Sequence, residues 1–170
     1  MSAGSARHSP IPELDRLRAD LGSLYRELDE AVARHQPTCE LSGRCCRFKE
    51  YDHMLFLSEP EATLLVADAP PPSRGLDAGA TCPWQDHRGR CTAREARPLG
   101  CRVFFCDPDY AEAGPVIAER FIFKLKQLAE SRGWAWNYAP LHRHLERARD
   151  DGRLHCPDVP EDAISMTEVR

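Results

Sequence analysis

The cysteines of this chain are concentrated in its middle, and this concentration constrains the fold more than any other feature of the sequence. Seven of the eight lie between residues 39 and 106, and the eighth is Cys156. The seven do not follow the period of a helix or a strand, as buried free thiols in a regular core would. They are Cys39, Cys45, Cys46, Cys82, Cys91, Cys101 and Cys106.

Three roles are open to such a set: disulfides, buried free thiols or metal ligands. The first ten residues contain no apolar segment of the kind found in signal peptides, so we expect a cytoplasmic protein. Cytosolic thiols are kept reduced, which disfavours disulfides. Thiolates select zinc, copper(I) and iron–sulfur clusters. The clustering therefore favours a thiolate metal centre, whereas Cys156 alone fits a buried free thiol.

Charge and hydropathy limit the other partners. The chain has 23 basic and 27 acidic residues and a formal net charge of −4, which is unlike a basic nucleic-acid-binding protein. No run approaches the ~18 consecutive apolar residues that a membrane span needs. We therefore expect neither a nucleic-acid partner nor a membrane partner.

A long amphipathic helix is predicted near the start of the chain. Apolar residues from Leu14 to Ala31 recur at alternating steps of three and four, which forms a heptad seam. Ser9 is a suitable N-cap, and Pro37 ends the helix near His35. A narrow seam packs on one other helix. That helix lies within this chain, or else residues 11–35 form the interface of a homodimer or bind a partner protein.

Further elements follow from local signals. Ser58 and Glu61 form a capping box that begins a short helix ending near Ala67. We also predict helices over 115–132 and 140–152, and a strand over 134–138. The expected fold is a small, mainly helical α+β single domain over 10–157 with an irregular cysteine-rich metal-binding centre. We expect a disordered tail over 1–9 and a flexible tail over 158–170.

The cysteine motifs resemble a known family. They are Cys39-x2-Ser42-x2-Cys45-Cys46, then Cys82-Pro83, Cys91 and Arg97-Pro98-x2-Cys101-Arg102. In this order they resemble the YkgJ-type cysteine-cluster proteins, whose signature is C-x2-C-x2-C-C and which are described as zinc- or iron-chelating domains. The resemblance covers residues 39–106 and implies metal binding. Ser42 stands where the family has its second cysteine, and a hydroxyl is a poor ligand for a soft metal.

The metal and its ligands stay open at this point. Adjacent side chains in an extended segment face opposite ways, so we expect only one of Cys45 and Cys46 to face the centre. The favoured set adds Cys39, Cys91 and Cys101, followed by Cys82 and Cys106. The chain has no intact C-x2-C knuckle, which counts against zinc. Cys-Pro dipeptides recur beside iron–sulfur ligands, so we prefer an iron–sulfur cluster over zinc.

The sequence supports binding more than catalysis. It contains no glycine-rich nucleotide loop and no Ser/His/Asp arrangement that a sequence can specify. We therefore expect a metal centre with a structural or electron-carrying role. A redox enzyme, a methylase-like accessory protein and an iron or zinc trafficking chelator are the alternatives. Whether the chain is an enzyme stays open.

Overall fold

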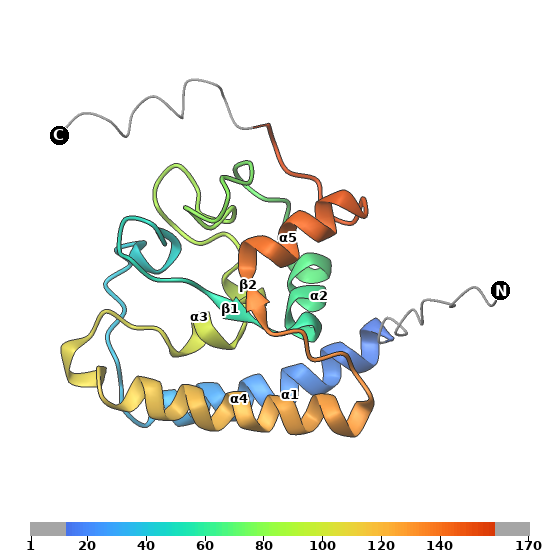
Figure 1. The fold of residues 1–170 in the computed structure, drawn as a ribbon. Coiled ribbons are helices and arrows are strands. Elements are labelled where there is room, and N and C mark those ends of the chain that lie inside the picture. Colours follow the sequence, from blue (N-terminus) through green and yellow to red (C-terminus); the bar gives the residue numbers. More distant parts are fainter. Residues whose placement is uncertain (1–12, 159–170) are drawn as a thin grey trace.

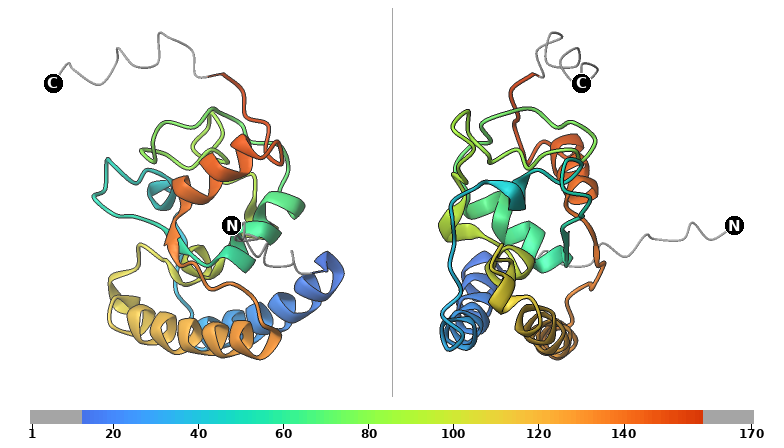
Figure 2. Two further views of the ribbon diagram at one scale, coloured as in Figure 1. Left: turned by 45° about the vertical axis from the view of Figure 1, so that its right-hand side comes forward. Right: turned by 90° about the vertical axis from the view of Figure 1, so that its left-hand side faces the viewer.

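Two long helices lie side by side along one edge of the molecule and run antiparallel (Figure 1). The computed structural model describes residues 13–158. The first long helix, α1, spans Leu14–Ala33, and the second, α4, spans Ala113–Arg132. The end-on view shows the pair beneath the rest of the chain (Figure 2). The predicted helix start at residues 10–12 and its N-cap, Ser9, lie outside the described residues, as do the predicted tail over 1–9 and residues 159–170 of the C-terminal tail.

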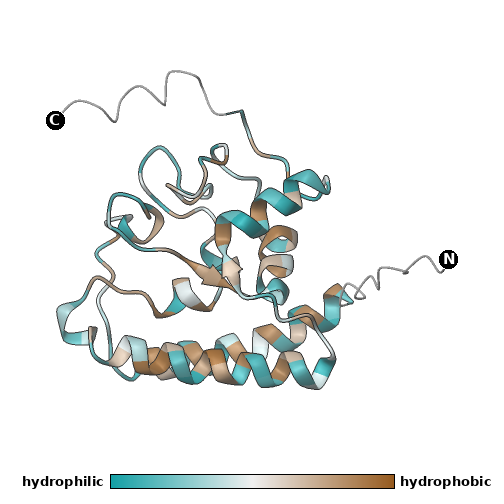
Figure 3. Cartoon of the chain, viewed as in Figure 1, coloured by the Kyte–Doolittle hydropathy of each residue, from teal (hydrophilic) through white to brown (hydrophobic). Residues whose placement is uncertain are grey.

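The heptad seam of α1 is buried within the chain. Leu17, Leu21 and Leu28 are fully buried, and they share one core with Phe121 and Leu125 of α4. Each such leucine contributes about 1.5–3 kcal/mol through the apolar surface that it removes from water. Hydrophobic and hydrophilic residues alternate around both helices (Figure 3). The seam therefore packs on helices of this chain, and this face is not free for a partner.

The capping box forms as predicted and begins helix α2, Glu59–Asp68. The backbone N–H of Ser58 donates to the Glu61 carboxylate over 3.0 Å. The same carboxylate accepts the Tyr25 hydroxyl at 3.1 Å and the backbone N–H of Leu99 at 2.8 Å. Burial of Glu61 raises its pKa. One buried carboxylate thus joins α2 to α1 and to the short helix α3, Leu99–Val103.

The predicted strand over 134–138 is wrong. The only described sheet pairs β1, Phe56–Leu57, antiparallel with β2, Ala139–Pro140. The segment before β2 caps helices instead: the N–H of Trp134 donates to the end of α4, and the carbonyl of Trp136 accepts the N–H of Glu59. Asn137 has a positive φ of 26°, which breaks the extended backbone. Two backbone groups of this segment are therefore bonded to helix ends and not to a strand.

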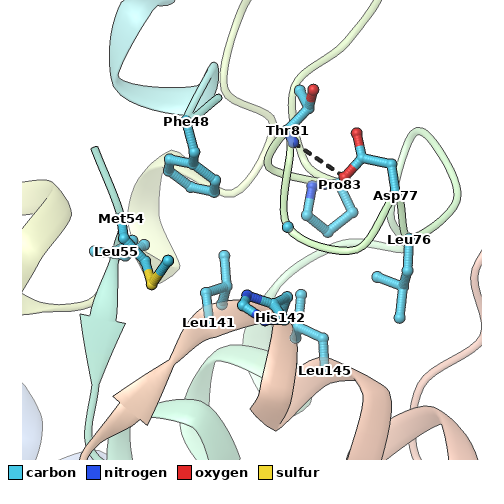
Figure 4. Close-up of a pocket in the computed structure, with 11 residues that line it drawn as sticks. Phe48, Met54, Leu55, Leu76, Asp77, Thr81, Pro83, Leu141, His142 and Leu145 are labelled. Carbon is cyan, nitrogen blue, oxygen red and sulfur yellow. Dashed lines mark hydrogen bonds between the residues drawn. The ribbon is translucent and has the colours of Figure 1, made fainter. Parts of the chain in front are cut away.

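A second core lies between α2, the cysteine loops and helix α5, Leu141–Asp150. Trp84 is 1% exposed and lies at its centre. Figure 4 shows one edge of this core, where Phe48, Leu141 and Leu145 meet the loop that carries Pro83. The cavity there measures about 10 Å³, which is too small for a ligand. These side chains pack against one another and hold the cysteine loops against α5.

The remaining elements are short. Three 3₁₀ turns interrupt the loops, at Arg44–Cys46, Arg94–Ala96 and Pro108–Tyr110. Helix α3 begins at Leu99, whose backbone N–H donates to the Glu61 carboxylate over 2.8 Å. The fold is mainly helical with one small two-stranded sheet, which agrees with the predicted mainly helical α+β class. Within residues 13–158, no helix is long and apolar enough to cross a membrane.

Candidate metal centre

The two cysteine-bearing loops approach each other closely at Gly43. Gly43 has a φ of 71°, and a Cβ atom there would collide with the carbonyl oxygen of Gly89 and lie 2.6 Å from Nε2 of Gln85. That amide nitrogen donates to the carbonyls of Gly43 and Gly89 over 2.9 and 3.1 Å. Gln85 is buried and clamps the loops together. Only glycine fits at position 43, because it alone has no Cβ atom and tolerates the positive φ.

Backbone hydrogen bonds fix the second loop. The N–H of Cys82 donates to the carbonyl of Cys46 over 2.8 Å, which ties the first loop to the second. Gln85 and Cys91 form an isolated antiparallel bridge. The turn between them is held by the Asp86 carboxylate, which accepts the N–H groups of residues 88 and 90. Cys82 and Cys91 are thereby held within reach of the Cys46 thiol.

The expectation that Cys45 and Cys46 face opposite ways is wrong. Their segment is a 3₁₀ turn and not extended, because Gly43 bends the chain directly before it. Their sulfur atoms are 3.9 Å apart. Both residues line the same pocket, so both thiols are available to one centre.

The thiol of Cys46 interacts with three other cysteine thiols. Hydrogen bonds to the thiols of Cys45, Cys82 and Cys91 raise the pKa of Cys46 far above its ordinary value. The bond from Cys46 lowers the pKa of Cys45 to about 6 and that of Cys91 to about 7. The backbone N–H of Ala93 also favours the thiolate of Cys91. Cys46 has a single S–H to donate, and the charge of Cys45 raises the pKa of Cys91, so the group favours one thiolate near neutral pH, on Cys45 or Cys91. The thiolate is the form that binds metals.

One arginine acts on these thiols. The charge of Arg97 favours the thiolate forms of Cys45 and Cys91. Arg47 and Arg102, which also flank cysteines in the sequence, pair with acidic residues instead, at 3.0 Å to Glu50 and 2.8 Å to Asp29. Arg97 therefore supplies positive charge that offsets the thiolates, and Arg90 and Arg94 also line the cysteine pocket.

A half-open pocket of about 410 Å³ lies against this group. It brings together five of the seven cysteines singled out from the sequence: Cys39, Cys45, Cys46, Cys91 and Cys106. Cys39 is exposed at the surface, whereas Cys46 is buried. Cys82 is buried behind the wall and does not line the pocket. The five come from three stretches of chain that lie far apart in the sequence.

Cys101 faces a different pocket. It lies on α3 and, with Cys45, lines a pocket of about 310 Å³ whose other walls are mainly apolar and aromatic. Burial raises the pKa of Cys101 well above its ordinary value. His53 stacks on Phe104 at this pocket, with ring centroids 5.2 Å apart. Cys45 thus stands between the two pockets.

Cys156 lies outside both pockets. It is half-buried at the edge of the second core, and burial raises its pKa. All eight cysteines are free thiols in this structure. Within residues 13–158, no three His, Cys, Asp or Glu side chains stand ready-made around a point that would hold a metal ion.

Gln85 is the residue that sequence reasoning missed. Its role depends on the approach of two carbonyl groups from different loops, for which a single sequence carries no signal. Comparison with family models, with curated proteins and with solved structures found no match to this chain. The resemblance of its motifs to the YkgJ-type proteins therefore stays a prediction.

Proposed function

We propose that this chain is a metal-binding protein that holds an iron–sulfur cluster through cysteine thiolates, in a structural or electron-carrying role. The observation that supports this best is the convergence of five cysteines on one pocket. An iron–sulfur cluster takes four thiolate ligands, so the pocket wall supplies enough. All eight cysteines are free thiols, so each of the five is available as a ligand.

The pocket has room for a cluster. Its volume is about 410 Å³, and it is half-open to solvent. The low pKa of Cys45, about 6, also lowers the cost of deprotonating one of the ligands.

Zinc is the alternative metal, and the distance between two cysteine sulfurs favours it. In a tetrahedral site with Zn–S bonds of about 2.3 Å, neighbouring sulfurs lie about 3.8 Å apart. The sulfurs of Cys45 and Cys46 are 3.9 Å apart. A zinc site would use the thiols around Cys46, including that of Cys82, and leave Cys39 and Cys106 outside.

A redox enzyme is the second candidate function. The observation in its favour is that Cys45 lines both the cysteine pocket and the apolar pocket of about 310 Å³. A small apolar molecule bound there would lie next to the centre. Binding without turnover remains the main proposal, because the convergence of five cysteines on one pocket supports a metal centre directly.

Metal analysis of the full chain after anaerobic purification tests the proposal. We expect iron and acid-labile sulfide in equal amounts, a brown colour and broad absorption in the visible region. Colourless protein with stoichiometric zinc would support the zinc site and refute the cluster. Protein that takes up neither metal after reconstitution with iron, sulfide or zinc would overturn the proposed function. A metal that exchanges rapidly into a chelator would favour trafficking over a structural role.

A further inference from the structure

Ser42 interrupts a regular series of thiols on the pocket wall. Cys39, Ser42 and Cys45 follow one another at steps of three, and all three line the pocket. A serine hydroxyl ionises far less readily than a thiol and binds soft metals poorly. The wall contributed by this loop therefore has one position from which a soft-metal ligand is missing.

A thiol from a distant part of the chain lies beside this position. The sulfur of Cys106 is 3.9 Å from the hydroxyl oxygen of Ser42, although the two residues are 64 positions apart. The next residue, Asp107, accepts the backbone N–H of Thr38 over 2.8 Å. This bond fixes the segment that carries Cys106 to the start of the first cysteine loop.

We propose that Cys106 supplies the thiolate ligand that Ser42 does not, so that the metal centre is closed by the segment after α3. In this arrangement the Ser42 hydroxyl donates to the thiolate of Cys106, as hydrogen-bond donors around a metal site commonly do. The inference rests on the proposed function, because it assigns one ligand of that centre.

The proposal makes the two positions exchangeable. A thiol placed at residue 42 would stand near the present Ser42 hydroxyl, whose oxygen lies 3.9 Å from the Cys106 sulfur. A chain with cysteine at 42 and serine at 106 keeps the same number of thiols on the same wall. It should therefore hold the same centre, whereas a chain with serine at both positions should not.

The test is an exchange of these two residues in the full chain. Cys106→Ser should lower iron and sulfide per chain at least severalfold, and adding Ser42→Cys to that variant should restore them and the visible absorption. Cys156→Ser is the matched control, because it removes a thiol outside the pocket, and it should keep the content of the original chain. Full metal content in Cys106→Ser would overturn the proposal, and so would a failure of the double variant to regain metal.

A second measurement does not depend on metal. In metal-free Ser42→Cys protein, a diazene oxidant should take one hydrogen from each of two thiols and leave a disulfide between residues 42 and 106, which peptide mapping detects. Absence of this crosslink in protein with an unchanged circular dichroism spectrum would overturn the placement. If the original chain takes up no metal but the crosslink forms, the proposed function fails while the placement of Cys106 stands.

Discussion

Replacement of Gly43 by alanine should separate the two cysteine loops. The positive φ at this position disfavours any residue with a Cβ atom, at a cost of about 1–2 kcal/mol. The new methyl group would also collide with the Gly89 carbonyl and the Gln85 amide. To relieve this contact the loops must move apart, which breaks the two hydrogen bonds that Gln85 donates.

The size of the effect follows from these contacts. Each lost hydrogen bond costs about 0.5–1.5 kcal/mol. With the backbone cost, Gly43→Ala should lower the free energy of unfolding by about 2–5 kcal/mol. Gly133→Ala is the matched control, because Gly133 also has a positive φ, of 67°, but a Cβ atom there meets nothing within 4 Å. Gly133→Ala should lower the free energy of unfolding only by the cost of a Cβ atom at positive φ, about 1–2 kcal/mol.

Urea unfolding of both variants under identical metal loading measures the difference. We expect Gly43→Ala to be the less stable of the two and to carry less metal per chain, because its loops no longer share one pocket. Gly133→Ala should keep the metal content of the original chain. Equal losses of stability in the two variants would show that the loops do not depend on this close approach.

Three further predictions concern the parts of the fold that carry the site. Burial raises the pKa of Glu61 above its ordinary 4.5, so the folded state binds the proton more tightly than the unfolded state. Stability should therefore fall as pH rises from about 4.5 through the raised pKa, and urea unfolding across this range should show no such slope in Glu61→Gln. Arg97→Gln should raise the pH at which the metal-free thiols react with iodoacetamide, because the charge of Arg97 favours the thiolate of Cys45; an unchanged pH profile would contradict this effect. Leu28→Ala should lower the free energy of unfolding by about 2–5 kcal/mol, whereas Val116→Ala, at a residue that is 68% exposed, should leave thermal unfolding nearly unchanged.

The long helices were predictable because each follows from local signals. The seam of α1, the capping box of α2 and Gly133 at the end of α4 all act as the sequence indicates. Val116 is exposed on α4, whereas Ile117, Phe121 and Leu125 of the same helix are buried.

The site was predictable in its residue types but not in its geometry. Spacing marked the cysteines, yet the turn that brings the Cys45 and Cys46 sulfurs together depends on Gly43 and on its contact with another loop. The proximity of Ser42 and Cys106 depends on how α3 packs, which no local pattern encodes. Contacts between segments far apart in the chain are therefore the part that only the structure supplies.

X-ray absorption at the metal edge of the anaerobically purified full chain tests the central claim most directly. The account predicts a first shell made of sulfur, with iron–iron scattering beyond it. Zinc surrounded by four sulfurs at about 2.3 Å would keep the thiolate centre and change its metal. A first shell made of oxygen or nitrogen would contradict the claim that these cysteines hold the metal.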